Sequence, residues 1–94
     1  MISVIWKFQF NIVDEFMLMI PRDARFLHAD IQAGVPCMWL MVDPNAEIEN
    51  VKFMVIGTGN HFDGFGNIIH RSTFQDKGFV WHLFEDIGPP GVVE

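Results

Sequence analysis

The stretch "ISVIWKFQF" (residues 2–10) sets the period of the chain. Apolar side chains at every second position alternate with Ser3, Lys7 and Gln9, and only Ile5 breaks the alternation. Successive side chains of a strand point to opposite faces, so a two-residue period predicts a half-buried β-strand. An amphipathic helix would instead place its apolar side chains three and four residues apart.

The same period returns along the rest of the chain. The segment "EFMLMI" (15–20) places its Phe, Leu and Ile on one face and its two methionines on the other. The residues just before Gly78 separate two further runs at the spacing of a β-hairpin. Strands are predicted over residues 2–10, 15–20, 24–32, 36–43, 48–57, 67–75 and 78–87.

Short polar and glycine-containing turns separate these strands. "PRDA" (21–24), "AGV" (33–35) and "DPNAE" (43–47) carry turn chemistry, and the last is also compatible with a short helical turn near residues 45–49. About seven short strands predict an all-β fold, either a small antiparallel β-sandwich or a barrel. We expect a single β domain over residues 1–87 and a loose C-terminal tail over residues 88–94.

The run "PCMWLMVD" (36–43) is apolar on both faces. A run of this kind favours a strand covered on both sides, at the centre of a sheet or at an oligomer contact, and Pro36 can only begin it. Cys37 lies in apolar surroundings, which predicts an unreactive thiol. As the single cysteine it excludes an intrachain disulfide, and this favours the cytosol.

Composition points to self-association. Half of the 94 residues are hydrophobic and 19% are charged, so some of the ten Phe, three Trp and six Met must lie on the surface of one copy. Contiguous exposed apolar patches usually mark interfaces, which predicts a homo-oligomer, most simply a two-fold dimer. A monomer with scattered apolar surface is the alternative.

The charge pattern narrows the class of partner. The net charge of −6 serves solubility and would also suit a basic partner. The six basic side chains are scattered, which argues against direct nucleic-acid binding. We expect no membrane association, because no apolar run approaches the roughly 20 residues of a membrane span.

The glycine-rich stretch "VIGTGNHFDGFGN" (55–67) invites three readings. It has no lysine and leads into a strand pattern, which excludes a Walker-type phosphate loop and a dinucleotide fingerprint. Asp63 is its single acidic residue, which is too few for a calcium loop. We expect a strand connection whose glycines permit positive φ, and which could line a ligand pocket.

No other pattern indicates catalysis or metal binding. The four histidines lack the close spacing of a metal site, and adjacent carboxylates on a strand point to opposite faces. The chain also lacks the sequence motifs of the common hydrolases and kinases. We therefore expect no catalytic residue, no metal and no cofactor, and interpret the protein as something other than an enzyme.

A small polar ligand, if one is bound, would lie in a pocket between subunits. The Gly57 to Asn67 loop would then supply backbone N–H groups. His61, Arg71 or His82 would supply charge or hydrogen bonds, and Trp39 or Trp81 would supply a stacking face. The complete set is Gly57, Thr58, Gly59, Asn60, His61, Arg71, His82, Trp39 and Trp81. Core packing is the commoner role of tryptophan in a strand.

Four stretches carry a resemblance to a known family. "IWKF" near the start, "GVPCMWLMVDP" (34–44), "VIGTG" followed by a histidine (55–61) and "FVWHLFE" (79–85) resemble small proteins of tailed phages and prophages that share a domain of unknown function. The likeness spans Ile5 to Glu85. Family members often read "GTGH" where this chain reads "GTGNH", which displaces the histidine by one position.

The resemblance implies a phage accessory protein in the host bacterial cytoplasm, and it implies no mechanism. Two functions are expected from it and from the composition. One is a non-enzymatic protein-binding module that acts on host or phage machinery. The alternative is a homo-oligomeric anti-defence protein that sequesters a small ligand such as a nucleotide signal.

Overall fold

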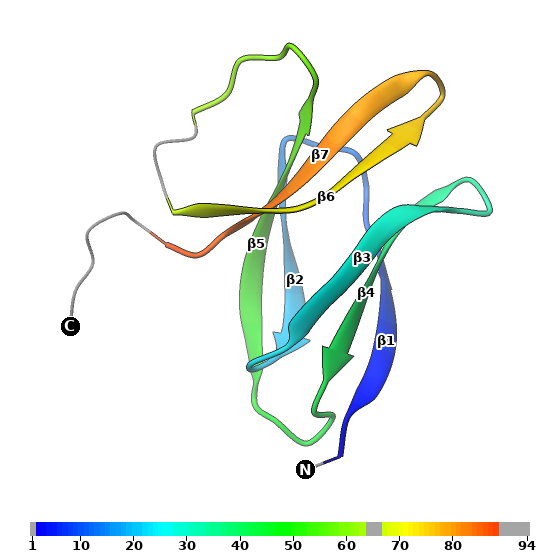
Figure 1. Ribbon diagram of the computed structural model, residues 1–94. Coiled ribbons are helices and arrows are strands. Elements are labelled where there is room, and N and C mark those ends of the chain that lie inside the picture. Colours follow the sequence, from blue (N-terminus) through cyan, green and yellow to red (C-terminus); the bar gives the residue numbers. More distant parts are fainter. Residues whose placement is uncertain (1, 64–66, 89–94) are drawn as a thin grey trace.

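The computed structural model describes residues 2–63 and 67–88, which form seven β-strands and no helix (Figure 1). The strands are β1 (Val4–Gln9), β2 (Glu15–Pro21), β3 (Arg25–Gln32), β4 (Val35–Val42), β5 (Ile48–Gly57), β6 (Ile68–Asp76) and β7 (Phe79–Asp86). Each lies within two residues of its predicted bounds, which confirms the all-β prediction. None of the described residues therefore belongs to a helix that could cross a membrane.

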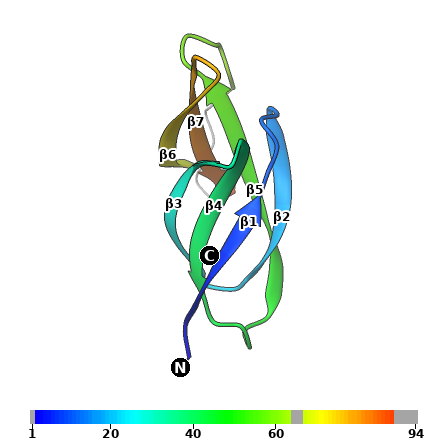
Figure 2. The ribbon, with the colours of Figure 1, turned by 90° about the vertical axis from the view of Figure 1, so that its right-hand side faces the viewer.

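The strands form two layers. One sheet has the order β1-β4-β3 and the other β2-β5-β7-β6, and all neighbouring strands are antiparallel. Figure 2 shows the three-stranded sheet in front of the four-stranded one, with β3 and β6 on one side and β1 and β2 on the other. The sheets do not close into a barrel, so the fold is the sandwich of the two predicted alternatives.

Two hairpins have the tight turns that the sequence predicts. Ala33 and Gly34 join β3 to β4 with φ angles of 51° and 79°, and Lys77 and Gly78 join β6 to β7 with 52° and 83°. Positive φ at both central residues is the type I′ geometry, whose twist matches that of the flanking strands.

The other connections are less regular. The Ala46 N–H donates to the Asp43 carbonyl at 3.1 Å in a plain turn, so the helical turn considered near residues 45–49 is not formed. Of the predicted tail over residues 88–94, only Gly88 belongs to the described residues. Its N–H donates to Asp86 Oδ1 at 2.9 Å.

Phenylalanine rings build the core between the sheets. Phe16 of β2 stacks on Phe10 and on Phe53, with ring centroids 5.3 and 5.5 Å apart. Phe74 of β6 meets Phe10 edge-on at 5.9 Å. Because these rings come from segments far apart in sequence, they tie both sheets into one core.

The β4 strand lies at the centre of its sheet, as predicted. Its inward side chains, including Met38 and Leu40, are buried in the core. Within residues 2–63 and 67–88, no strand covers its outer face. There the Lys7 Nζ donates to Gln32 Oε1 at 2.8 Å across β4. Cys37 is 1% exposed on this strand, as its apolar surroundings predict.

A buried serine joins the two sheets where β3 and β6 run side by side. Ser72 Oγ donates to the Ala29 carbonyl at 2.9 Å and accepts from the Ala29 N–H at 3.4 Å. Each strand has an irregularity in its register just before this contact, between Phe26 and His28 in β3 and between His70 and Ser72 in β6. One hydroxyl thus satisfies backbone groups that the edge of β3 would otherwise leave unpaired.

We expect Ser72→Ala to lower the free energy of unfolding by about 1–3 kcal/mol, because it leaves the buried N–H and the buried carbonyl of Ala29 without this hydrogen-bond partner. Urea unfolding measures the change. Gln75→Ala, at an exposed position of the same strand, is the matched control and should change stability by less than about 0.5 kcal/mol. Equal losses in the two variants would contradict a bridging role for the serine.

Candidate functional site

An open hollow of about 590 Å³ lies where β5 runs past the beginning of β2. The pairing of the two strands begins at Glu15 and Met54, and the Val55 N–H donates to the Asp14 carbonyl at 3.2 Å. Beyond this point β5 has no strand neighbour on that side among the described residues. Residues 12–15 form one wall of the hollow and residues 60–63 the other.

A tight turn shapes the second wall. The Asn60 N–H donates to the Gly57 carbonyl at 3.0 Å, and Gly59 has a φ of 86°. A Cβ on Gly57 would lie 2.7 Å from Asn60 Nδ2 and 3.1 Å from Trp81 Cζ3. Glycine at position 57 therefore permits the close approach of these two side chains. Of the predicted connection, residues 64–66 lie outside the described residues.

The rim of the hollow is acidic. Its ionisable side chains are Asp14, Glu15, Asp63, Asp86, Lys52 and His61. Lys52 Nζ lies 3.1 Å from Glu15 Oε2 and 3.8 Å from Asp86 Oδ2. Asp14 and Asp63 have no ion-pair partner among residues 2–63 and 67–88. Four carboxylates against one ammonium group leave a formal charge of −3 when His61 is neutral.

Apolar side chains also line the hollow. They include Ile12, Val13, Met54, Ile56, Phe62 and Trp81. Phe62 is 49% exposed and lies 6.1 Å, centroid to centroid, from Phe84 of β7. The Trp81 Nε1–H is buried and has no hydrogen-bond partner within the described part of the chain. The site thus combines exposed apolar side chains with a negative rim.

Four of the residues predicted to bind a ligand meet at this hollow. Gly57, Asn60, His61 and Trp81 all line it, although Trp81 lies 20 or more residues from the other three along the chain. Gly59 shapes the same turn without lining the hollow. The structure therefore brings three of the five predicted loop residues together with one of the two predicted tryptophans.

Thr58 and His82 belong to a separate polar cluster. Thr58 Oγ1 lies 2.7 Å from His82 Nε2, and Thr73 Oγ1 lies 2.9 Å from His82 Nδ1. Thr73 Oγ1 is also 2.9 Å from His70 Nε2. This chain of contacts joins the end of β5 to β6 and β7, and its hydrogen bonds occupy both nitrogens of His82.

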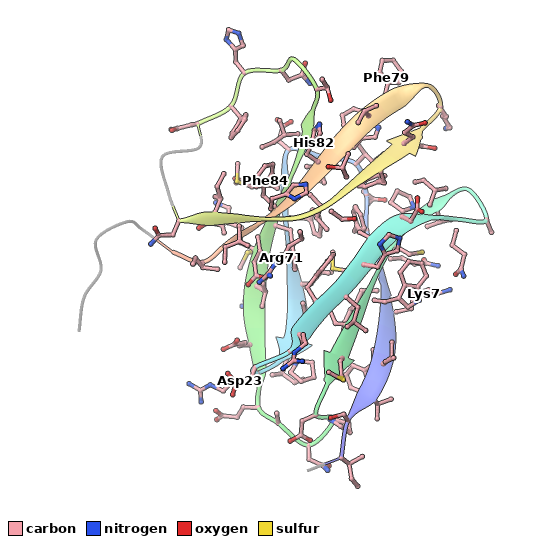
Figure 3. The ribbon with its side chains drawn as sticks, viewed as in Figure 1. Lys7, Asp23, Arg71, Phe79, His82 and Phe84 are labelled. Carbon is pink, nitrogen blue, oxygen red and sulfur yellow. The ribbon has the colours of Figure 1, made fainter. Side chains whose placement is uncertain are left out.

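Arg71 and Trp39 lie elsewhere on the same chain. Arg71, which Figure 3 labels, donates through Nε and Nη2 to Glu85 Oε1, at 3.1 and 2.9 Å. Its guanidinium lies 5.9 Å from the Phe26 ring centroid. Trp39 packs against His28 on the outer face of the other sheet, with ring centroids 6.2 Å apart. Neither side chain reaches the hollow within one copy.

Sequence reasoning missed the acidic rim. It treated the carboxylates of residues 14–15 and 85–86 only as neighbours along the chain, whereas Lys52 brings Glu15 and Asp86 together across three strands. The length of the 48–57 strand relative to the 15–20 strand was the available signal, since the longer strand must overhang the shorter. Within residues 2–63 and 67–88, no group of three or more His, Cys, Asp or Glu side chains is placed to hold a metal ion.

We expect Gly57→Ala to destabilise the fold by about 1 kcal/mol, because its methyl group would displace the end of the exposed Asn60 side chain and press on Trp81. Asn60→Ala removes the nearer obstacle. The double variant should therefore be less destabilised than the sum of the single variants, by at least about 0.5 kcal/mol. Urea unfolding of the four proteins measures this coupling, and strictly additive losses would show that the two residues do not pack as described.

Comparison with known proteins identifies the family and no activity. A family model described as "Domain of unknown function (DUF7352)" matches residues 1–91, which is nearly the whole chain. No curated protein and no solved structure matches the chain. The family match covers both sheets and the whole hollow. The chain therefore belongs to the family defined by this domain of unknown function, DUF7352.

Proposed function

We propose that this protein is a non-enzymatic binding module for another protein, and that the acidic hollow receives a basic, partly apolar segment of that partner. The observation that carries the proposal is that apolar side chains and a net charge of −3 line a single hollow of about 590 Å³. Lysine and arginine fit such a site, because each has an apolar stem and a cationic head.

Within a single copy, two carboxylates are available for such a head group. Asp14 and Asp63 stand on opposite walls of the hollow and have no ion-pair partner in the described part of the chain. A guanidinium or ammonium group between the walls would gain charge-assisted hydrogen bonds. Its stem, or a neighbouring aliphatic side chain, would contact Met54 and Phe62. Methionine suits this role, since its flexible thioether adapts to different partners.

The overall charge of the chain agrees with a basic partner. A net charge of −6 attracts a cationic surface and raises the rate of encounter with it. The resemblance to phage and prophage proteins supports the wider proposal of an accessory protein that acts on host or phage machinery in the bacterial cytoplasm.

Sequestration of a nucleotide signal, as in an anti-defence protein, is the second candidate. Asn60, His61 and Trp81 at one hollow are the observation in its favour. The negative rim repels phosphate groups, and the guanidinium of Arg71 is engaged by Glu85. Protein binding is therefore the function that the geometry supports better.

Binding to a random peptide array tests the proposal. We expect the peptides that bind to carry Lys or Arg beside an aliphatic residue. Asp63→Asn should raise their Kd about tenfold, because it removes a charged hydrogen-bond acceptor from the rim. Asp30→Asn, an exposed carboxylate on the other sheet, is the matched control and should leave the Kd unchanged.

A preference for acidic peptides, or full affinity in Asp63→Asn, would contradict the proposal. Thermal unfolding with mononucleotides and cyclic dinucleotides tests the alternative, the sequestering function. A ligand that binds only the folded state raises the melting temperature. We expect no shift, and a clear shift would favour the sequestering function instead.

A further inference from the structure

The two sheets have four edge strands, and their free edges are not equivalent. The edges of β3 and β6 meet at Ser72 and Ala29. On β1, Lys7 lies in the middle of the strand, and a charged side chain at an edge opposes pairing with another chain. The remaining edge strand is β2, which runs along the right-hand margin of the molecule in Figure 2.

The β2 strand lacks the features that normally protect an edge. Its sequence EFMLMIP has a charge only at its first residue and a proline only at its last. It pairs with β5 in unbroken register, without a bulge. Met17 and Met19 are 56% and 68% exposed on its outer face. A long, regular, apolar edge of this kind is a template for a further strand.

The register shows which backbone groups β2 leaves open. At its two ends, the Asp14 carbonyl accepts from Val55 and the Arg22 N–H donates to the Glu47 carbonyl. In an antiparallel ladder, alternate residues bond to the same neighbour, so the even-numbered residues of β2 face β5. The N–H and C=O groups of Met17 and Met19 therefore point to the open edge.

We propose that β2 pairs with β2 of a second copy, antiparallel, about a two-fold axis at Leu18. The two four-stranded sheets then form one continuous sheet across the dimer. Met17 lies opposite Met19 of the second copy, and both pairs exchange N–H···O bonds. The exposed methionines of the two copies gather on one face, so pairing removes apolar surface as well as open backbone groups.

Charge complementarity favours this register. It also favours a second copy of the chain as the partner that pairs with the open edge of β2. With the axis at Leu18, Asp14 lies opposite Arg22 of the second copy at both ends of the contact. Arg22 also lies 3.3 Å, through Nη1, from Glu47 Oε2 of its own chain, and its 60% exposed side chain leaves further donors for Asp14. With the axis at Met19, Glu15 would instead oppose Asp23, and like charges directly opposite each other are destabilising. With the axis at Met17, Asp14 would oppose Ile20. The strand is therefore complementary to itself in hydrogen bonds, in apolar side chains and in charge.

Light scattering and sedimentation test the dimer. The unmodified chain should have twice its mass of 10.8 kDa at micromolar concentration. Replacing both methionines, M17K/M19K, should give a folded monomer, because lysines on an edge block pairing. Ile5→Lys, at a 60% exposed position on the other open edge, is the matched control and should remain dimeric.

Thermal unfolding of each variant shows whether it is folded. A folded monomer for the unmodified chain would overturn the proposal. A dimer that persists in M17K/M19K would also overturn it. Loss of the dimer in Ile5→Lys would overturn it as well, because that result would place the contact on β1. The proposal does not rest on peptide binding, and Asp63→Asn should leave the mass unchanged.

A charge exchange tests the register. Asp14→Arg and Arg22→Asp should each raise the dimer Kd, by about fivefold or more, because each places like charges at both ends of the contact. Mixing the two variants should restore the Kd of the unmodified chain, since each acidic position then meets a basic one. Failure of the mixture to restore dimer formation would reject the Leu18 register.

Discussion

Backbone hydrogen bonding at the sheet edges is the constraint on which this fold depends. A sandwich that does not close has unpaired N–H and C=O groups along its edges, and buried groups of this kind must find partners. Ser72 meets this need on one side by bonding both backbone groups of Ala29. On the other side, β2 remains open and apolar. In the proposed dimer the open backbone groups of β2 also find hydrogen-bond partners, as those of β3 do at Ser72.

The two-residue hydrophobic period predicted the strands because it reports directly on backbone geometry. It also assigned faces correctly within a strand, as Ile20 at 1% exposure and Met19 at 68% show. The tight turns at Gly34 and Gly78 followed from local chemistry. Sandwich and barrel remained alternatives, because the choice rests on how β3 meets β6, a contact between segments 43 residues apart along the chain.

The candidate site was predictable only in part, for the same reason. Alternation places Trp39 and Trp81 on strand faces, but it does not say which sheet each strand joins. In the structure Trp81 lines the hollow between the walls at residues 12–15 and 60–63, whereas Trp39 lies on the outer face of the opposite sheet. The acidic rim arises from the overhang of β5 beyond β2, which depends on register. Local sequence patterns contain no information on such register.

The open edge and the hollow lie beside each other, and Asp14 belongs to both. In the proposed dimer each hollow is therefore bordered by Arg22 of the second copy, and self-association would affect the surface that a protein partner meets. The apolar excess of the composition would then have two uses, one in the contact between copies and one in the lining of the hollow.

Amide hydrogen exchange of β2, followed by NMR at high and at low protein concentration, tests this arrangement most directly. The N–H groups of Met17 and Met19 should exchange slowly in the concentrated sample and rapidly on dilution, whereas those of Phe16 and Leu18 should be protected in both. Rapid exchange of Met17 and Met19 at every concentration would contradict an edge that pairs with its own copy.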